Sequence, residues 1–160
     1  MNNDDLWNFA LACYAKPGVE SACLDLQALG FDVCLLLACS WLEIRGVRHD
    51  TQRMEQLNQL SLDWQGTVVI PLRSLRNEWR ERAATDTALA DFRKRVKTLE
   101  LDAERIQLDR LQLTAQHWRK EGGAHDWLDQ LGAGVEGDHC ALLDVLRRAA
   151  SAQLDAGVED

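Results

Sequence analysis

The chain has 160 residues, of which 46% are hydrophobic and 28% charged, with a formal net charge of -8. This length fits one domain with its own hydrophobic core. The acidic balance argues against non-specific nucleic-acid binding, which needs a concentrated positive surface. The longest apolar run, residues 33–39, is far shorter than the roughly 20 residues that cross a membrane. The first five residues are acidic where a secretory signal is basic, so we expect a cytoplasmic protein.

Three helices are predicted in the first third of the chain. An aspartate near the start can cap a first helix, which Pro17 and Gly18 end. A second helix follows and ends at Gly30, a residue suited to a left-handed C-cap. Asp32 then caps a third helix over residues 33–45. Because its leucine-rich stretch is apolar on all sides, we expect this helix at the centre of the core.

The segment that follows the third helix combines a helical pattern with residues typical of strands. A fourth helix is predicted over about residues 50–62. Residues 66–71 are rich in β-branched side chains, which are typical of strands. Since a single strand has no partner, we predict an extended stretch that leads into a fifth helix, with Leu72, Leu75 and Trp79 facing the core.

The longest predicted helix covers about residues 86–118, with no glycine or proline, and would measure roughly 50 Å. Its apolar residues alternate spacings of three and four, as in a coiled coil or helical hairpin. These residues are Leu89, Phe92, Val96, Leu99, Ala103 and Ile106. Two interpretations stay open, namely packing within the chain and self-association of a protruding half.

The last part is predicted to be a glycine-rich loop around a short helical turn, then a helix over residues 138–154. We therefore predict an all-α fold, an irregular bundle of six or seven helices with one long helix. Residues 1–154 would form a single domain, and residues 155–160 a mobile acidic tail.

The chain contains no convincing catalytic, cofactor or metal motif. Residues 132–137 match G-x-G-x-x-G, but the surrounding βαβ pattern of a dinucleotide site is absent. The spacings of His117, His125 and His139 match no compact zinc pattern. The five cysteines, an odd number, are predicted to be reduced thiols. The sequence gives no indication of catalysis, and we predict no cofactor.

Positive charge is concentrated in residues 73–97, whereas the two ends of the chain are acidic. Arg73, Arg76 and Arg80 lie one helical turn apart and could bind an acidic protein surface or phosphate. Interleaved acidic residues could instead pair with them and leave a solvated face. Trp118 is a further candidate contact, because tryptophan is enriched at interaction hot spots.

The first third resembles a known family through its Leu-Trp-x-Phe, Tyr-x-x-Pro-Gly-Val, Leu-Gln, Asp-Val-x-Leu-Leu-Leu and Trp-Leu motifs, between Leu6 and Leu42. The chain is similar to an uncharacterised proteobacterial family, a domain of unknown function made of small helical proteins. The resemblance implies bacterial origin and a helical fold, and it supplies no catalytic residue. The polar and aromatic positions that look family-like, without a known role, are Trp7, Tyr14, Gln27, Asp32 and Trp41.

These observations predict a non-catalytic cytoplasmic adaptor or regulatory protein that acts through protein–protein interaction and forms a homodimer. One alternative is a nucleic-acid-associated protein that uses the basic stripe of residues 73–97. A second alternative is a small-molecule binder or enzyme with a pocket in the bundle, near Tyr14, Gln27 and Asp32.

Overall fold

The computed structural model describes residues 5–122 and 126–156. Over these residues the chain forms helices and loops, and β-pairing is confined to one isolated bridge between Val47 and Lys120. The predicted all-α fold is confirmed. The predicted long helix is also present, as α7 (Thr87–Ala115).

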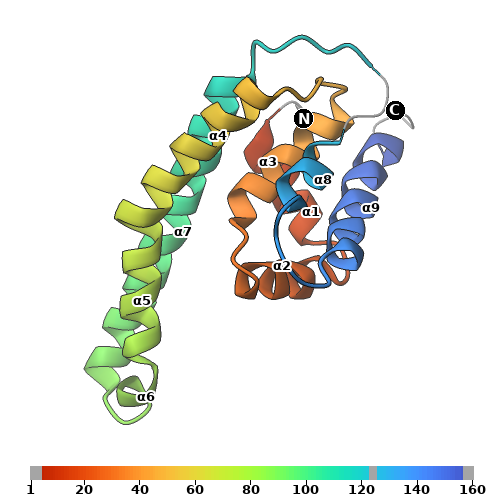
Figure 1. The fold of residues 1–160 in the computed structure, drawn as a ribbon. Coiled ribbons are helices and arrows are strands. Elements are labelled where there is room, and N and C mark those ends of the chain that lie inside the picture. Colours follow the sequence, from red (N-terminus) through yellow and green to blue (C-terminus); the bar gives the residue numbers. More distant parts are fainter. Residues whose placement is uncertain (1–4, 123–125, 157–160) are drawn as a thin grey trace.

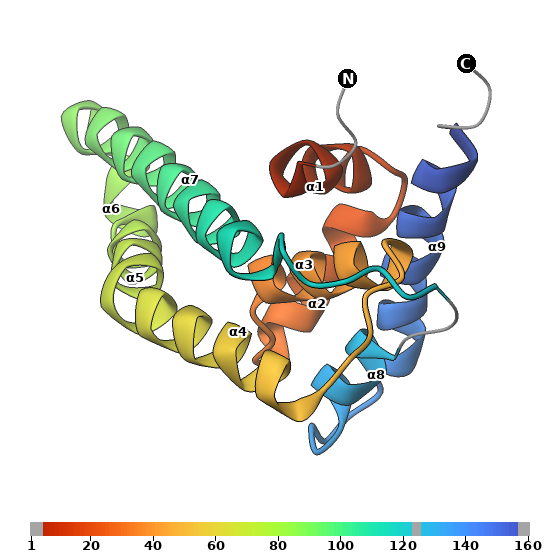
Figure 2. The ribbon, with the colours of Figure 1, turned by 90° about the horizontal axis from the view of Figure 1, so that it is seen from above.

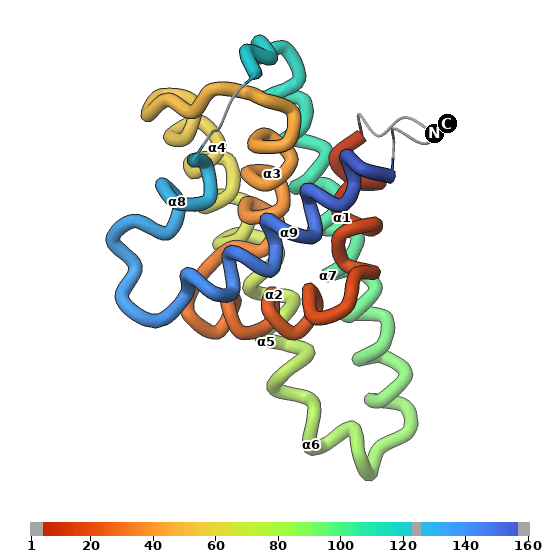
Figure 3. Tube along the Cα trace, turned by 90° about the vertical axis from the view of Figure 1, so that its right-hand side faces the viewer, coloured from red at the N-terminus to blue at the C-terminus, as the bar shows by residue number. Residues whose placement is uncertain are grey.

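Five helices form the body of the protein (Figures 1 and 3). They are α1 (Leu6–Tyr14), α2 (Val19–Ala28), α3 (Val33–Ile44), α8 (Trp127–Gly132) and α9 (Cys140–Ala156). Nine of the twelve residues of α3 are buried, and α1, α2, α8 and α9 all pack against it. The central position predicted for this helix is therefore confirmed. Asp32 caps it as expected, because its side chain accepts from the backbone N–H groups of Cys34 and Leu35.

The remaining helices form a hairpin that projects from the body (Figures 1 and 2). The outgoing arm consists of α4 (Thr51–Trp64), a π-helical turn, α5 (Ile70–Glu78) and the short tip helix α6 (Arg80–Ala83). The returning arm is α7, whose 29 residues correspond to about 43 Å. The distal part of this hairpin therefore has a helix partner on one side only.

The extended stretch predicted over residues 66–71 is wrong. The helix continues through it as the π-helix η1 (Gln65–Val69). Val69 is fully buried, and the Thr67 hydroxyl donates to the Asp63 carbonyl at 2.8 Å. Local β-propensity is thus overridden by tertiary packing against α7, and the backbone accommodates the segment by widening one turn.

The C-terminal helices α8 and α9 contact the rest of the body near the end of α3. The Trp127 ring is fully buried and its Nε1–H donates to the Val47 carbonyl at 2.8 Å. The Glu43 carboxylate accepts from the Leu128 N–H at 2.9 Å and from Arg147. The helix α9 extends over residues 155 and 156 of the predicted tail, and residues 157–160 lie outside the described residues.

Candidate functional site

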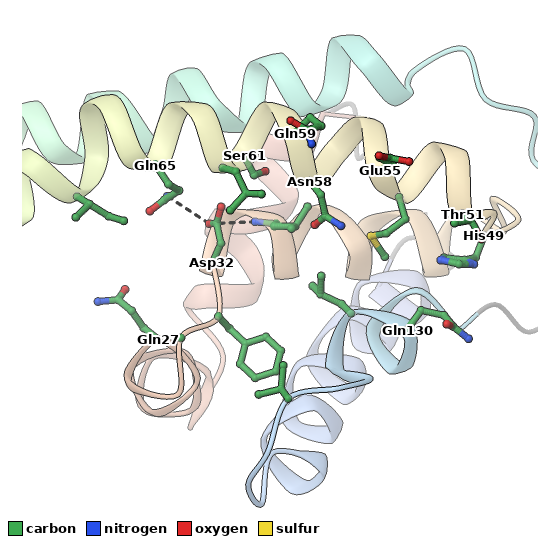
Figure 4. Close-up of a pocket in the computed structure, with 18 of the residues that line it drawn as sticks. Gln27, Asp32, His49, Thr51, Glu55, Asn58, Gln59, Ser61, Gln65 and Gln130 are labelled. Atoms are coloured by element: carbon green, nitrogen blue, oxygen red, sulfur yellow. Dashed lines mark hydrogen bonds between the residues drawn. The ribbon is translucent and has the colours of Figure 1, made fainter.

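A groove of about 860 Å³ separates the outgoing arm of the hairpin from the body (Figure 4). Its hairpin wall includes Met54, Asn58, Ser61 and Gln65, whose spacings of three and four place them on one side of the helix. The body wall is built from the end of α2, the loop before α3, the first turn of α3, and α8 with the residues after it. The hairpin and the body thus form opposite sides of one site.

Two polar side chains of the groove lining, Asp32 and Gln65, form a hydrogen-bonded group with the buried Gln107, which we call the Asp32 cluster. The Gln107 Nε2–H group donates to Asp32 Oδ2 at 2.6 Å. The Gln65 Nε2–H group donates to Gln107 Oε1 at 2.8 Å and to Asp32 Oδ1 at 3.3 Å. Gln107 is fully buried, and burial raises the pKa of Asp32 above its ordinary value. The cluster ties α3, η1 and α7 together through neutral amides.

The π-helical turn begins at Gln65, which donates hydrogen bonds to the other two residues of this cluster. A π-helix inserts one residue into the helical repeat, and such turns are frequent at functional sites. Here it changes the register of the hairpin arm at the point where that arm meets Asp32. The local irregularity and the polar cluster therefore coincide.

Two other polar atoms that line the groove have no hydrogen-bond partner in the part of the chain that the structure describes. They are Ser61 Oγ, on a side chain whose residue is only 2% exposed, and His49 Nε2. Buried polar atoms are nearly always hydrogen-bonded in folded proteins. Both atoms are consequently candidates for contact with a bound group.

The predicted basic stripe is divided by ion pairs inside the hairpin. Arg73 Nε lies 2.8 Å from Glu100 Oε1 and its Nη2 lies 3.1 Å from Glu104 Oε1, while Arg76 also pairs with Glu100. Burial opposes ionisation of Glu100, but the hydrogen bonds from Arg76 and Arg73 lower its net pKa. Arg80 is exposed and contacts Asn77 instead. The structure thus separates Arg80 from the two arginines that it was predicted to join.

The other predicted site residues are distributed over the body. Trp118 is half-buried and stacks on Trp127, with 5.9 Å between ring centroids. The guanidinium groups of Arg105 and Arg45 lie over the rings of Trp7 and Trp41, at 4.8 and 4.4 Å. These tryptophans are engaged in packing within the chain.

The groove brings together two of the family-like residues, Gln27 and Asp32, while Tyr14 lies outside its lining. Sequence reasoning missed Gln65 and Gln107 as partners of Asp32. The sequence does contain one indication, because Ser61 and Gln65 lie four residues apart on a polar helix face. This spacing did not show which part of the chain packs against that face.

A second surface lies on the hairpin, along α7. Four apolar side chains, each 40–62% exposed, recur every seven residues and so occupy one side of the helix. We call them the α7 row: Phe92, Leu99, Ile106 and Leu113. Trp79 of the outgoing arm stacks on Phe92 at a centroid separation of 5.5 Å. No residue of α5 or α6 is buried.

The described residues do not gather three His, Cys, Asp or Glu side chains as metal ligands. His125, one of the histidines considered above, lies outside them. None of the helices described combines the length and the apolar composition needed to cross a membrane.

Comparison with protein-family models matches residues 5–111 to a family described as "Protein of unknown function (DUF2390)". Comparison with curated proteins gives no match, and comparison with solved structures gives none. The matched residues contain the Asp32 cluster and the α7 row as far as Ile106. Both surfaces are thus part of the matched region.

Proposed function

Because the chain belongs to the DUF2390 family of unknown function, we propose a role from its own geometry: a non-catalytic adaptor or regulatory protein of the bacterial cytoplasm. It binds helices of other proteins along the α7 row. A second copy of the chain is its first partner, which makes it a homodimer. The observation that carries this proposal is the exposure of the α7 row, whose distal part lies on the projecting end of the hairpin, where only the outgoing arm packs against α7.

The α7 row leaves apolar surface of the hairpin uncovered. Helices bury an apolar stripe by packing in layers, and two helices alone cover only their facing sides. The facing side of α7 is used, since Val96 and Ala103 are buried. The α7 row lies beside that side and remains half exposed, over 21 residues or about 32 Å of helix. A partner helix along the row would complete the packing.

A second copy suits this row because of its heptad spacing. Apolar residues at a seven-residue repeat remain aligned along two helices that coil around each other. In a two-fold dimer the same row is presented by both chains, so two hairpins would form a four-helix bundle. The α7 row alone would then be sufficient as the dimer contact.

The nucleic-acid alternative has weaker support. Phosphate binding by Arg73 or Arg76 would have to compete with Glu100, which holds both guanidinium groups. Arg93 is also engaged, because its Nε–H donates to the Arg76 carbonyl at 2.7 Å. These internal contacts favour a structural role for this part of the basic stripe.

The test is the oligomeric state in solution, measured by light scattering after size exclusion. We expect about 36 kDa for the native protein, twice the 18.1 kDa of one chain. Leu99→Glu places a charge in the α7 row and is expected to give the monomer mass. The matched control is Leu101→Glu: Leu99 is 54% and Leu101 53% exposed, but Leu101 points about 200° away around the helix.

The control should leave the dimer intact. A native protein that has the monomer mass throughout the micromolar range would refute the homodimer. Equal effects of the two substitutions would instead show that the α7 row is not the contact surface. Steeply salt-dependent retention of nucleic acid by the native protein would favour the alternative.

A further inference from the structure

We infer that the groove between α4 and the body is a binding site for an extended segment of another protein, and that this segment carries a lysine or arginine side chain. This inference rests on the groove alone and is independent of the α7 row. Four features support it: the shape of the groove, the amides of its walls, its unpartnered buried atoms and its charge.

The shape of the groove favours a chain over a compact molecule. Its hairpin wall runs from Thr51 at the start of α4 to Arg73 in α5, a helical path of about 33 Å. Figure 4 shows Gln27 and Gln130 on the body side toward opposite ends of this path. An extended peptide advances about 3.3 Å per residue, so some ten residues would match the wall.

The walls offer the chemistry that a peptide backbone requires. Five side-chain amides line the groove, and each carries a donor and an acceptor, as every peptide unit does. They are Gln27, Asn58, Gln59, Gln65 and Gln130. Because the N–H groups of Gln65 already donate within the Asp32 cluster and Gln130 Nε2 donates to Asp126, these two amides offer chiefly their oxygens. Between them lie apolar side chains, including Phe31, Leu35, Met54 and Leu131. Alternate side chains of an extended segment could enter these apolar places while its backbone meets the amides.

The unpartnered atoms indicate contact with a bound group. Ser61 Oγ lies in the hairpin wall, and Figure 4 shows Ser61 on α4 between Gln65 and Asn58. His49 Nε2 lies toward the α8 end of the same groove. A backbone N–H or C=O of the segment would provide the missing partners.

The charge of the groove selects a cationic side chain. The Asp32 carboxylate accepts hydrogen bonds from amide and backbone N–H groups, whereas the nearby Arg73 guanidinium is held by Glu100 and Glu104. Glu55 is exposed in the hairpin wall and has no ion-pair partner in the described ranges. The groove lining thus holds two carboxylates against one guanidinium, that of Arg73, which is shared with Glu100 and Glu104.

The experiment uses two fluorescein-labelled pools of random decapeptides, one with lysine and the other with glutamate fixed at a central position. Binding to the full-length protein is followed by fluorescence anisotropy. We expect the lysine pool to bind at least about tenfold more tightly than the glutamate pool. Glu55→Lys should abolish this preference and Asp32→Asn should reduce it. Spermidine is titrated separately as a small cation.

The matched control is Asp63→Lys, which makes the same type of charge change on an exposed residue of α4 outside the groove lining. It should retain the preference for lysine. The Leu99→Glu variant should also retain it, which separates this inference from the proposed homodimer. Equal binding of the two pools, an unchanged preference in Glu55→Lys, or saturable binding of spermidine without peptide binding would each overturn the inference.

Discussion

Removing the Asp32 carboxylate should destabilise the protein, because two interactions are lost together. Asp32→Ala deletes the N-cap of α3, which costs about 1 kcal/mol. It also leaves the Nε2–H group of the fully buried Gln107 without its acceptor, which costs about 1–3 kcal/mol. The expected loss is about 2–4 kcal/mol. For a chain of this size that corresponds to a fall in Tm of about 5–15 °C.

The isosteric variant Asp32→Asn should behave differently. Its side-chain oxygen can still cap α3, and its amide can donate to Gln107 if the amides of Gln107 and Gln65 both flip. We expect its free energy of unfolding at pH 7 to lie within about 1 kcal/mol of the native value. The assay is urea unfolding of the three proteins, followed by circular dichroism.

The stability of the protein should depend on pH through the ionisation of Asp32. Burial raises the pKa of Asp32 in the folded state, so ionisation of this group costs stability at neutral pH. Its contribution is most favourable below the unfolded pKa and is lost as the pH rises through the folded pKa. The native protein should therefore gain stability relative to Asp32→Asn on acidification. A loss of less than about 0.5 kcal/mol for Asp32→Ala, or equal losses for both variants, would refute the role of the Asp32 cluster.

Three further outcomes are expected. Glu100→Ala should lower the free energy of unfolding, measured by urea denaturation, by about 3 kcal/mol, because two arginines lose their carboxylate partner. Since the pKa of Glu100 is lowered in the folded protein, the stabilisation by this group should be lost as the pH falls through that folded pKa. Gly46→Ala should lower the Tm and reduce the free energy of unfolding by about 1–2 kcal/mol, because φ is +68° and the new Cβ would lie 3.0 Å from the Gly122 backbone. An unchanged Tm would contradict this close approach. A thiol reagent should modify the exposed Cys140 quickly in the native protein and the other four cysteines only on unfolding, since burial raises the pKa of Cys23 to about 12; more than one fast thiol would contradict the burial.

Local features of the sequence were sufficient to predict most helices. Asp32 and Gly30 are strong start and stop signals, and the all-round apolar character of α3 indicated its central position. The long helix was predictable because it lacks helix-breaking residues. The π-helix was not, since β-branched residues 67–69 suggest extended chain and only packing of the hairpin arms keeps them helical.

The candidate site depended on contacts between distant residues, which one sequence does not reveal. Asp32 and Gln107 are 75 positions apart, and Arg73 and Glu100 are 27 apart. One of the interpretations left open by the sequence was that the basic stripe pairs with acidic neighbours on its own helix, one turn away. Its best acceptors lie instead on the opposite arm, which became adjacent only through the turn at α6.

Because Trp127 packs against the chain at the end of α3, we expect that the matched region does not fold on its own. The family match ends at residue 111, inside α7, whereas the cover of α3 on one side comes from α8 and α9. A chain cut after residue 111 would expose the leucines of α3 to water and leave the Val47 carbonyl without its indole donor. We therefore expect the smallest fragment that folds to retain the helices up to Ala156. The hairpin tip could be shortened in matched steps on both arms without uncovering this core.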